Sequence, residues 1–437
     1  MRAETPSLRD IAEPAIVNGA AWRALAMLWF LYVLNFLDRG LLSTLAKPIQ
    51  DSLHISDSQL GLISGLYFAV FYCFIAIPVG WLADRTNRVK VLALACGIWS
   101  GATAACGLAG NFPQLVAARM IVGVGEAGGV PPSYAIITDY FPPGRRGTAL
   151  AIYNLGPPIG QAFGLAAGAS IAAAFGWRYA FLFLGAAGVV SALFVRLALR
   201  EPPQGRFDQA RSAAAVSASF WATVKAFLSR PSLVLAAFAC GTTQVITYGA
   251  GAFTNLILMR EKGMTLAEAA VWPAVVVAVF MSGGILASGR VIDRHAVRWK
   301  PAYALIPAIS LALALPFYLG FVLAPGWPLA VAFLAGPYFL NFFYLSSAVA
   351  LVQEESAPNQ RVMAGALLLL IMNLMGMGIG PTFVGALSDR LRAAHPQHSL
   401  QMALLALAPL YILAVILFLV LTLVLSKEHA TARESRR

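Results

Sequence analysis

The sequence predicts an all-α membrane protein, in which twelve transmembrane helices form two pseudo-symmetric halves of six. The composition is the first reason: 59% of the 437 residues are hydrophobic and 11% are charged, whereas a soluble domain carries about 25% charged residues. Long segments without a charged residue are the second reason, because a transmembrane helix needs about 20 apolar residues. The third reason is an internal duplication.

Gly and Pro residues divide the longest apolar segments into separate spans. Asn111-Phe112-Pro113 separates the third span from the fourth, and the Ala-Pro-Gly-Trp-Pro run at 324–328 separates the ninth from the tenth. The predicted spans are residues 22–46, 59–83, 90–110, 113–138, 146–173, 177–199, 231–258, 267–289, 300–323, 328–352, 362–388 and 400–426.

The distribution of Lys and Arg predicts the orientation. An even number of spans places both termini on one side, and cytoplasmic termini put 23 of the 31 Lys and Arg residues inside and 6 outside, with Arg39 and Arg119 within the membrane. The positive-inside rule therefore favours a multi-pass protein of the plasma (inner) membrane with both termini cytoplasmic. Glu4, Asp10 and Glu13 precede the first span, unlike a cleaved signal peptide, so we expect that span to be retained.

One long interior loop, residues 201–230, separates the two halves. Its first part has the composition of a flexible linker, and its second part has apolar residues at helical spacing. We expect an amphipathic helix on the inner membrane surface there; the alternative is an early start of the seventh span. The expected divisions are a cytoplasmic N-terminal tail (1–21), a six-helix bundle (22–200), the linker with its helix (201–230), a second six-helix bundle (231–426) and a cytoplasmic C-terminal tail (427–437).

The two halves share a repeated element. Gly80-Trp81-Leu82-Ala83-Asp84-Arg85 follows span two and recurs as Gly289-Arg290-Val291-Ile292-Asp293-Arg294 after span eight, at a shift of 209 residues. The same shift carries Ser56, before span two, onto Thr265, before span eight. Duplication of this kind is typical of transporters, whose substrate site lies near the membrane midplane between the halves.

Motifs of the first half resemble those of a known family. Gly80, Asp84, Arg85 and Arg88 match the Gly-x-x-x-Asp-Arg-x-x-Arg element of the major facilitator superfamily. Within that superfamily the chain resembles the spinster family. The other resembling stretches are Asn35–Arg39, Ile77–Gly80, Arg119–Ala127, Asp139–Phe141, Arg145-Arg146 and Pro157–Gly160.

This resemblance implies the major facilitator fold and a lipid substrate. Animal spinster proteins are known for sphingosine-1-phosphate and lysophospholipids, which implies a single-chain amphiphile with a charged head. The resemblance also implies a cytoplasmic gate, whose charges hold the halves together when the protein faces outward. The expected gate residues are Asp84, Arg85, Arg88, Asp139, Arg145, Arg146, Asp293 and Arg294. For some of these cations a topology-setting role alone is the alternative.

Four charged residues lie deep inside spans one and four. Asp38, Arg39, Arg119 and Glu126 would each cost several kcal/mol if they faced lipid, so each must face protein or a wet cavity. Asp38 and Arg119 fall at a similar depth, and Glu126 lies about 10.5 Å from Arg119 along the helix axis. We expect Asp38 to pair with Arg119, or Arg39 with a partner in span four, and Glu126 to be less well compensated. Asn35 can hydrogen-bond to either member of the first-span pair.

These charges suggest a coupling mechanism. A buried carboxylate that is incompletely compensated takes up a proton near neutral pH. Our hypothesis is that Asp38 and Glu126 are the protonation sites and that Arg119 or Arg39 receives an anionic headgroup, freed when its carboxylate is protonated. The alternative is a permanent ion-pair network that clamps spans one and four together.

The second half lacks these charges. At the shift of 209 residues, Asp38 and Arg39 correspond to Thr247 and Tyr248. We therefore expect the second half to supply the pocket for an apolar tail, although any aromatic or Met residue can equally be ordinary packing. The candidate substrate-binding residues from both halves are Asn35, Arg39, Arg119, Tyr248, Asn341 and Tyr344.

The combined prediction is a proton-coupled secondary active transporter that moves a lysophospholipid or sphingoid phosphate by alternating access. The expected partners are this substrate, protons and membrane lipids, and we expect a monomer. The alternatives are a proton-coupled carrier of a small organic anion and a non-transporting lipid sensor. No nucleophile constellation, nucleotide loop or metal-ligand spacing is recognisable, so we expect no enzyme, cofactor or metal. The net charge of +12 is attributed to topology and anionic lipid, not to nucleic acid.

Overall fold

The described residues of the computed structural model, 19–204, 207, 220–296, 299–356 and 360–434, form helices and turns without a strand among them. The N half contains α1 (Gly19–Thr44), α2 (Ala46–Leu53), α3 (Asp57–Ser64), α4 (Leu66–Arg85), α5 (Arg88–Leu108), α6 (Phe112–Glu126), α7 (Val130–Tyr140), α8 (Pro143–Tyr153), α9 (Gly156–Phe175) and α10 (Trp177–Ala198). The C half contains α12 (Pro231–Arg260), α13 (Leu266–Val276), η2 (Val277–Met281), α14 (Ser282–Ala296), α15 (Ala302–Leu323), α16 (Trp327–Leu340), α17 (Phe343–Glu355), α18 (Arg361–Asn373), η3 (Leu374–Ile379), α19 (Gly380–Leu391), α20 (Ser399–Leu405) and α21 (Ala408–Glu434).

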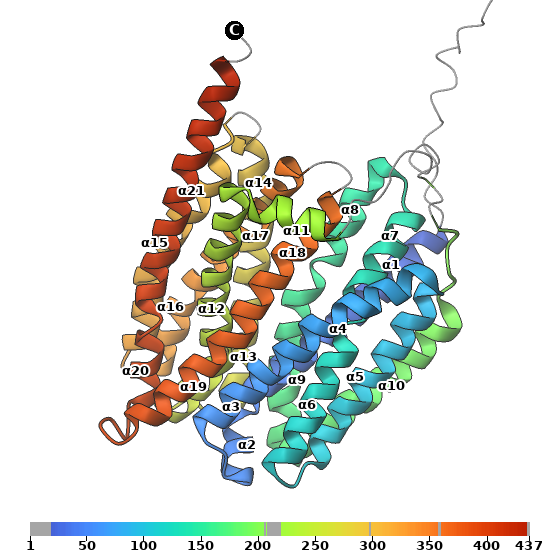
Figure 1. Cartoon of the computed structure of the whole chain (residues 1–437). Coiled ribbons are helices and arrows are strands. Elements are labelled where there is room, and N and C mark those ends of the chain that lie inside the picture. Colours follow the sequence, from blue (N-terminus) through green and yellow to red (C-terminus); the bar gives the residue numbers. More distant parts are fainter. Residues whose placement is uncertain (1–18, 205–206, 208–219, 297–298, 357–359, 435–437) are drawn as a thin grey trace, which may run out of the picture.

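Eleven helical stretches of the described chain are long and apolar enough to cross a membrane. The remaining predicted span, the fourth, consists of α6 and α7 with an interruption at residues 127–129. The predicted all-helical architecture with its two halves is therefore confirmed. The two halves lie side by side in Figure 1, and both α1 and α21 have their outer ends at its top. We name this the termini end, and the end with α2, α3 and α20 the opposite end.

The duplicated starts of spans two and eight are confirmed as helix caps. Ser56 accepts a hydrogen bond from the backbone N–H of Gln59, whose side chain accepts one from the backbone of Ser56. Thr265 and Glu268 form the same reciprocal capping box before α13. A capping box satisfies two backbone donors that a helix start would otherwise leave unpaired. The repeat therefore fixes where both spans begin.

The second part of the interior loop forms a separate helix, α11 (Phe220–Leu228). It crosses the termini end of the C half in Figure 1 and contacts α12 and α18. The alternative of an early seventh span is wrong, because the chain turns at Ser229-Arg230 before α12 begins. The tail at 1–18 and most of the linker, 205–206 and 208–219, lie outside the described residues.

Most of the helices that join the two halves are interrupted, whereas α1 and α12 are continuous. Contacts between the halves run from α3 to α19, from α4 to η3, from α9 to α13 and η2, and from α1 to α12. Span two breaks at Gly65, span five breaks at Asn154-Leu155, and spans eight and eleven contain the π-helices η2 and η3. Breaks and π-helical turns are local departures from the α-helical hydrogen-bond pattern, at which helices bend. The contact surface between the halves is thus built largely from segmented helices.

Glycines bring α1 and α9 into backbone contact. A Cβ atom at Gly160 would lie 2.2 Å from the Val33 carbonyl oxygen, and one at Gly164 would lie 2.1 Å from the Leu37 carbonyl oxygen. Neither distance leaves room for a side chain, so only glycine lets the two backbones approach this closely. Leu37 directly precedes Asp38 and Arg39, so this contact also fixes the position of the charged part of α1.

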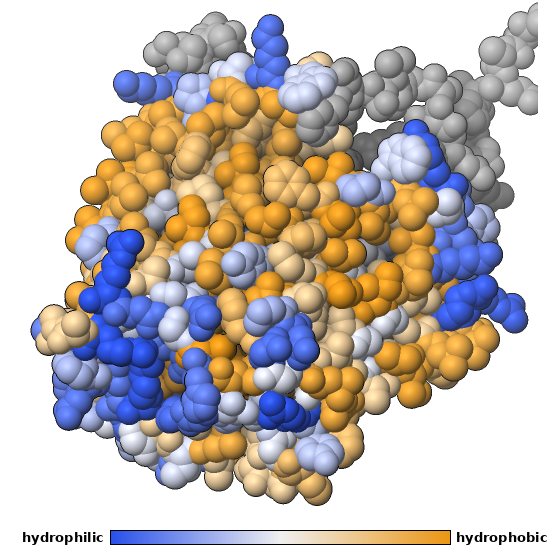
Figure 2. All heavy atoms as spheres, turned by 60° about the horizontal axis from the view of Figure 1, so that its bottom comes forward, coloured by the Kyte–Doolittle hydropathy of each residue, from blue (hydrophilic) through white to orange (hydrophobic). Residues whose placement is uncertain are grey.

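Apolar side chains cover the outer surface of the bundle. Large exposed hydrophobic residues occur on nearly every span, with Phe74, Leu94, Val190 and Leu423 among the most exposed. Polar residues gather instead on the face at the opposite end, seen in the lower part of Figure 2. This distribution suits a bilayer around the bundle with water at its ends.

We predict that Gly164→Ala destabilises the protein, because the added Cβ forces α9 away from α1. Overpacking of this kind costs about 1–3 kcal/mol, so the thermal midpoint in detergent micelles should fall. Gly147→Ala in α8 is the matched control, since a Cβ there meets nothing within 4 Å. Equal midpoints for the two variants would contradict the proposed backbone contact.

Candidate functional site

The four charged residues of spans one and four meet inside the N half. α1 supplies Asp38 and Arg39, and α6 supplies Arg119 and Glu126, its last residue. Asp38 and Arg119 form an ion pair, with Arg119 Nη1 3.1 Å from Asp38 Oδ2. Both side chains are almost completely buried, at 2% and 3% exposure. The first of the two expected pairings is therefore present.

The second expected pairing is present as well. Arg39 donates to Glu126 Oε2 from Nε at 2.8 Å and from Nη2 at 2.7 Å. Glu126 is thus paired, because the long Arg39 side chain spans the distance from α1 to this deeper position. Its second oxygen, Oε1, has no partner among the described residues, so the expectation that Glu126 is the less compensated carboxylate stays a prediction. The Glu126 side chain is fully buried, and that of Arg39 is 15% exposed.

Aromatic rings enclose the two guanidinium groups. The Arg39 guanidinium carbon lies 4.7 Å from the Phe36 ring centre, 5.1 Å from that of Phe68 and 5.0 Å from that of Tyr72. The Phe68 ring also lies 5.4 Å from the guanidinium carbon of Arg119. A cation over an aromatic face is stabilised by about 0.5–2 kcal/mol. The rings of α1 and α4 therefore help both cations to remain charged away from bulk water.

Each ion pair uses only part of its hydrogen-bonding capacity. Asp38 Oδ1, Glu126 Oε1, Arg119 Nε and Asn35 Nδ2 are buried without a hydrogen-bond partner among the described residues. Asn35 Nδ2 lies near Gly129, in the interruption between α6 and α7. Buried polar atoms without partners are uncommon and costly in folded proteins. Their clustering here leaves each carboxylate with one oxygen in its ion pair and one without a partner.

The C half contributes polar residues that face this cluster. Tyr248 of α12 interacts electrostatically with Arg39 and Glu126, as its position opposite Arg39 in the repeat suggested. Tyr344 of α17 is buried and interacts with Gln244 and Tyr248 of α12. Gln244 Oε1 is buried and has no hydrogen-bond partner in the described part of the chain. Sequence reasoning missed Gln244, although it is one of only two amides, with Asn255, in the apolar stretch of span seven.

Asn341 belongs to another environment. Its Nδ2 donates to the Tyr411 hydroxyl at 2.9 Å, and that hydroxyl donates to Asn341 Oδ1 at 3.2 Å. Tyr411 lies on α21, so the amide is occupied within the C half. A contact between Asn341 and substrate therefore stays a prediction. Asn341 satisfies a polar contact at the break between α16 and α17.

The expected gate residues lie at the termini end, and the ion pairs that the structure describes there each lie within one half. Arg88 pairs with Asp139 at 2.5 Å and with Glu201 at 2.6 Å, which joins α5, α7 and the end of span six. Arg146 donates to the Thr138 and Phe141 carbonyl oxygens. Arg85 lies over the Trp81 ring, and Arg145, Asp293 and Arg294 are exposed. The Asp84 side chain is outside those that the structure describes, and the gating role of this set stays a prediction.

Glu201 also pairs with Arg88, and it was not predicted from the sequence. It lies at the start of the linker and has no counterpart in the internal repeat. Sequence reasoning also missed Asp57, whose carboxylate joins the two halves at the opposite end. At the same place Asp389 caps α3 from the other half. Within the described residues, no group of three or more His, Cys, Asp or Glu side chains could hold a metal ion.

We predict that Arg119→Gln destabilises the protein strongly, because it leaves the Asp38 carboxylate buried and unpaired. Breaking a buried ion pair in this way costs about 3–5 kcal/mol. The double variant Asp38→Asn/Arg119→Gln should lose less, since it buries no charge at this position. Denaturant unfolding in micelles measures both effects. The control is Lys47→Gln, which breaks an exposed pair with Asp51 and should cost about 1 kcal/mol or less. A double variant as unstable as Arg119→Gln would contradict this account.

Comparison with known proteins identifies the family. The sequence profile of the Major Facilitator Superfamily matches residues 28–375. The chain is 33% identical over 392 residues to an MFS-type efflux pump of Mycolicibacterium smegmatis, covering 89% of each protein. It is 26% identical to protein spinster homolog 1 of Homo sapiens, covering 85% of this chain and 74% of that protein.

A solved structure of similar fold is that of a bacterial homologue of the human lysosomal transporter spinster, in an inward-facing and unoccupied conformation. It has 27% sequence identity and a TM-score of 0.86, and the match covers 94% of this chain and 98% of that one. This agreement includes both halves and the way they are arranged. The chain therefore belongs to the spinster family of the Major Facilitator Superfamily.

Proposed function

We propose that this transporter is a proton-coupled carrier of an amphiphilic lipid with an anionic headgroup, of the lysophospholipid or sphingoid phosphate class. The observation that carries the proposal is the state of Arg39. Its guanidinium is held by aromatic rings and by a single oxygen of Glu126, and part of the side chain remains exposed beside α12. A cation in this position can exchange a carboxylate partner for a substrate anion.

The two arginines are unequal candidates for the headgroup. The Arg119 side chain is 3% exposed, against 15% for Arg39. Tyr248 faces Arg39 from the other half. We therefore assign the headgroup contact to Arg39, with Tyr248 and Tyr344 on the other side of the substrate. Arg119 holds Asp38 in place.

The ion pairs support proton coupling, because in each of them one carboxylate oxygen has no partner among the described residues. A proton on the free Oε1 of Glu126 would remove the charge that holds Arg39 and so release the guanidinium for a substrate anion. Asp38 has the same arrangement with its free Oδ1 and Arg119. Because Phe68 contacts both guanidinium groups, a shift of one arginine changes the packing of the other. This contact supports a coupling between the two protonation sites.

The proposed orientation places the termini end in the cytoplasm. The excess of Lys and Arg at that end supports it, by the positive-inside rule. The hydrogen bonds from Ser43 to the Gly251 carbonyl oxygen and from Asn255 to Thr44 join the halves toward the opposite end. With this orientation the described state faces inward, as does the solved bacterial spinster homologue.

A second candidate substrate class is a small organic anion. It is supported by the 26% identity, over 82% of this chain and 86% of the relative, to a hexuronate transporter of Bacillus subtilis. Arg39 suits a carboxylate as well as a phosphate, so the cation does not separate the two classes. We favour the amphiphile because the chain belongs to the spinster family and because Arg39 is surrounded by rings.

We predict that Glu126→Gln and Asp38→Asn each abolish the dependence of transport on a pH gradient. Neither amide can take up a proton, so flux should no longer respond when the gradient is imposed. The measurement is lysophosphatidylglycerol flux in proteoliposomes, with glucuronate as the probe for the rival substrate class. Asp51→Asn, which alters an exposed carboxylate, is the control. Unchanged pH-dependent flux in both amide variants would sink the protonation hypothesis.

We also predict that Arg39→Gln weakens binding of lysophosphatidylglycerol by about tenfold or more. A charge-assisted hydrogen bond contributes about 1.5–3 kcal/mol, and 1.4 kcal/mol corresponds to tenfold. Binding should be measured by calorimetry in micelles, with Arg196→Gln as a control at an exposed arginine of α10. If Arg39→Gln binds normally while Arg119→Gln does not, the headgroup assignment must pass to Arg119.

A further inference from the structure

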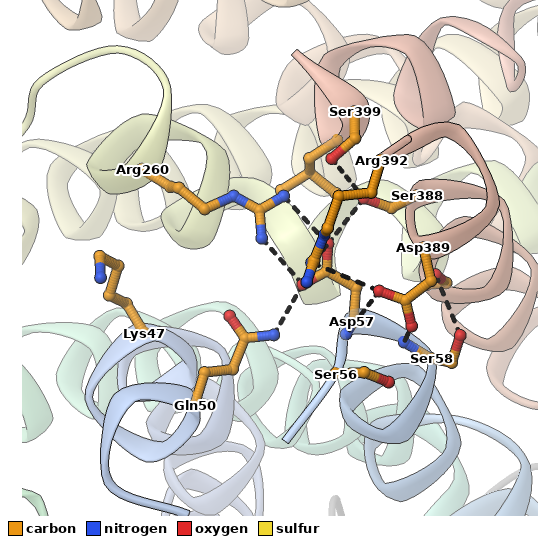
Figure 3. Close-up of polar contacts among 12 residues, drawn as sticks. Lys47, Gln50, Ser56, Asp57, Ser58, Arg260, Ser388, Asp389, Arg392 and Ser399 are labelled. Atoms are coloured by element: carbon orange, nitrogen blue, oxygen red, sulfur yellow. Dashed lines mark hydrogen bonds and ion pairs between the residues drawn. The ribbon is translucent and has the colours of Figure 1, made fainter. Parts of the chain in front are cut away.

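The Asp57 carboxylate, at the start of α3, is a shared acceptor for side chains of both halves (Figure 3). Oδ1 accepts from Gln50 Nε2 at 2.6 Å and from Arg260 Nη1 at 2.8 Å. Oδ2 accepts from Arg260 Nη2 at 3.0 Å and from the Ser388 hydroxyl at 2.6 Å, and it lies 3.1 Å from Arg392 Nη2. Only Gln50 among these partners belongs to the N half.

The same place holds a second contact between the halves. Asp389 of α19 accepts from the backbone N–H of Asp57 at 3.2 Å and from that of Ser58 at 2.7 Å. It thereby caps the first turn of α3 from the other half. Glu261 pairs with Arg260 at 3.5 Å and accepts from the backbone N–H of Leu400 at the start of α20. Helices α3, α12, α19 and α20 are thus joined through one group of charges.

The burial of Asp57 makes these contacts hard to break separately. Its side chain is completely buried, whereas those of Arg260 and Arg392 are 24% and 48% exposed. A carboxylate has about four lone-pair sites, so the five donors around Asp57 satisfy it fully. A buried carboxylate that loses its cations keeps the cost of its desolvation. The halves therefore cannot part at Asp57 unless this charge is rehydrated or neutralised.

Water can reach the cations from one side. A cavity of about 500 Å³ lies at the opposite end and is lined by Lys47, Gln50, Asp51, Arg260 and Arg392, among others. Lys47 and Asp51 pair with each other on α2, within the N half. The two arginines therefore connect a hydrated surface to the buried carboxylate beneath it.

Backbone packing brings α3 and α19 together around Asp57. A Cβ atom at Gly385 would lie 2.2 Å from the Asp57 carbonyl oxygen, and one at Gly61 would lie 2.4 Å from the Pro381 carbonyl oxygen. At the termini end, the ion pairs of Arg88 with Asp139 and of Lys300 with Glu355 each stay within one half. Among the described residues, the ion pairs between the halves therefore gather at the opposite end.

We propose that Asp57, Arg260 and Arg392 form a latch that closes the opposite end, and that its release is the step that lets this end open during transport. The latch is not part of the repeat: the capping boxes at Ser56 and Thr265 are duplicated, but Asp57 corresponds to Leu266. The inference rests on the proposed alternation between two states and requires neither the lipid substrate nor proton coupling. It makes Asp57 a gating residue, remote from Arg39 and Glu126.

The test measures distances between spin labels without substrate or a pH gradient. One label pair, at Ala174→Cys and Ala394→Cys, reports the opposite end, and a second pair, at Thr148→Cys and Gln353→Cys, reports the termini end. All four positions are exposed, and the four native cysteines are buried. In Asp57→Asn the first distance should lengthen and the second shorten. The ratio of molecules closed at the opposite end to those open there should fall by at least about tenfold.

Three further variants serve as controls for Asp57→Asn. Asp51→Asn removes a carboxylate from the same cavity but not from the latch, so its distances should equal those of the parent protein. Arg392→Gln should give a smaller shift than Asp57→Asn, because Arg260 still contacts both carboxylate oxygens. Unchanged distances in Asp57→Asn overturn the latch. If that variant does not fold, unchanged distances in both Arg260→Gln and Arg392→Gln overturn it. Neither result bears on the flux experiments, so the two proposals can fail separately.

Discussion

The cost of holding ionised groups away from water governs this structure. Arg39 and Glu126 are both inside an apolar bundle, and each is tolerated only because the other is within hydrogen-bonding distance. Rings of α1 and α4 lie around the guanidinium and help to hold this pair away from bulk water. The neighbouring pair of Asp38 and Arg119 imposes the same demand. Together the two pairs place the buried charges in the N half, and the C half supplies hydroxyl and amide groups that face them.

Meeting this demand depends on contacts that carry no charge. Gly160 and Gly164 allow α9 to touch the backbone of α1 immediately before the charged pair. The interruption after Glu126 turns the chain before α7 begins, and Asn35 lies beside it. Small residues and helix ends therefore position the charges, in the same way that a rigid scaffold positions a binding loop. The family's sequence motifs in the first half therefore include the residues that position the charges as well as the charged residues themselves.

Much of the fold could be predicted from the sequence because bilayer thickness and charge exclusion leave few alternatives. The number of spans, the duplication and the pairing of Asp38 with Arg119 all followed from apolar length, repeat spacing and helical rise. Contacts that depend on tertiary approach did not follow. The length of the Arg39 side chain overcame the depth difference from Glu126, and Asn341 turned toward Tyr411 on a helix seventy residues away. The role of Asp57 could not be predicted, because a carboxylate at the start of a helix is common and usually caps it. The residues next to Asp57 in the sequence do not indicate that two arginines of the other half contact it.

The π-helical segment η3 has a consequence for how the two halves came to differ. An α-helix turns by about 100° per residue, so a segment that accommodates an additional residue rotates everything beyond it by a comparable angle. Residues 374–379 therefore set which face of α19 is presented to α3, and with it the direction of Ser388 and Asp389. A one-residue insertion in an ancestral repeat is enough to bring a new set of side chains to an existing interface. The opposite end can thus acquire its own chemistry by a change of helical phase, while the motifs that the halves inherited remain in place.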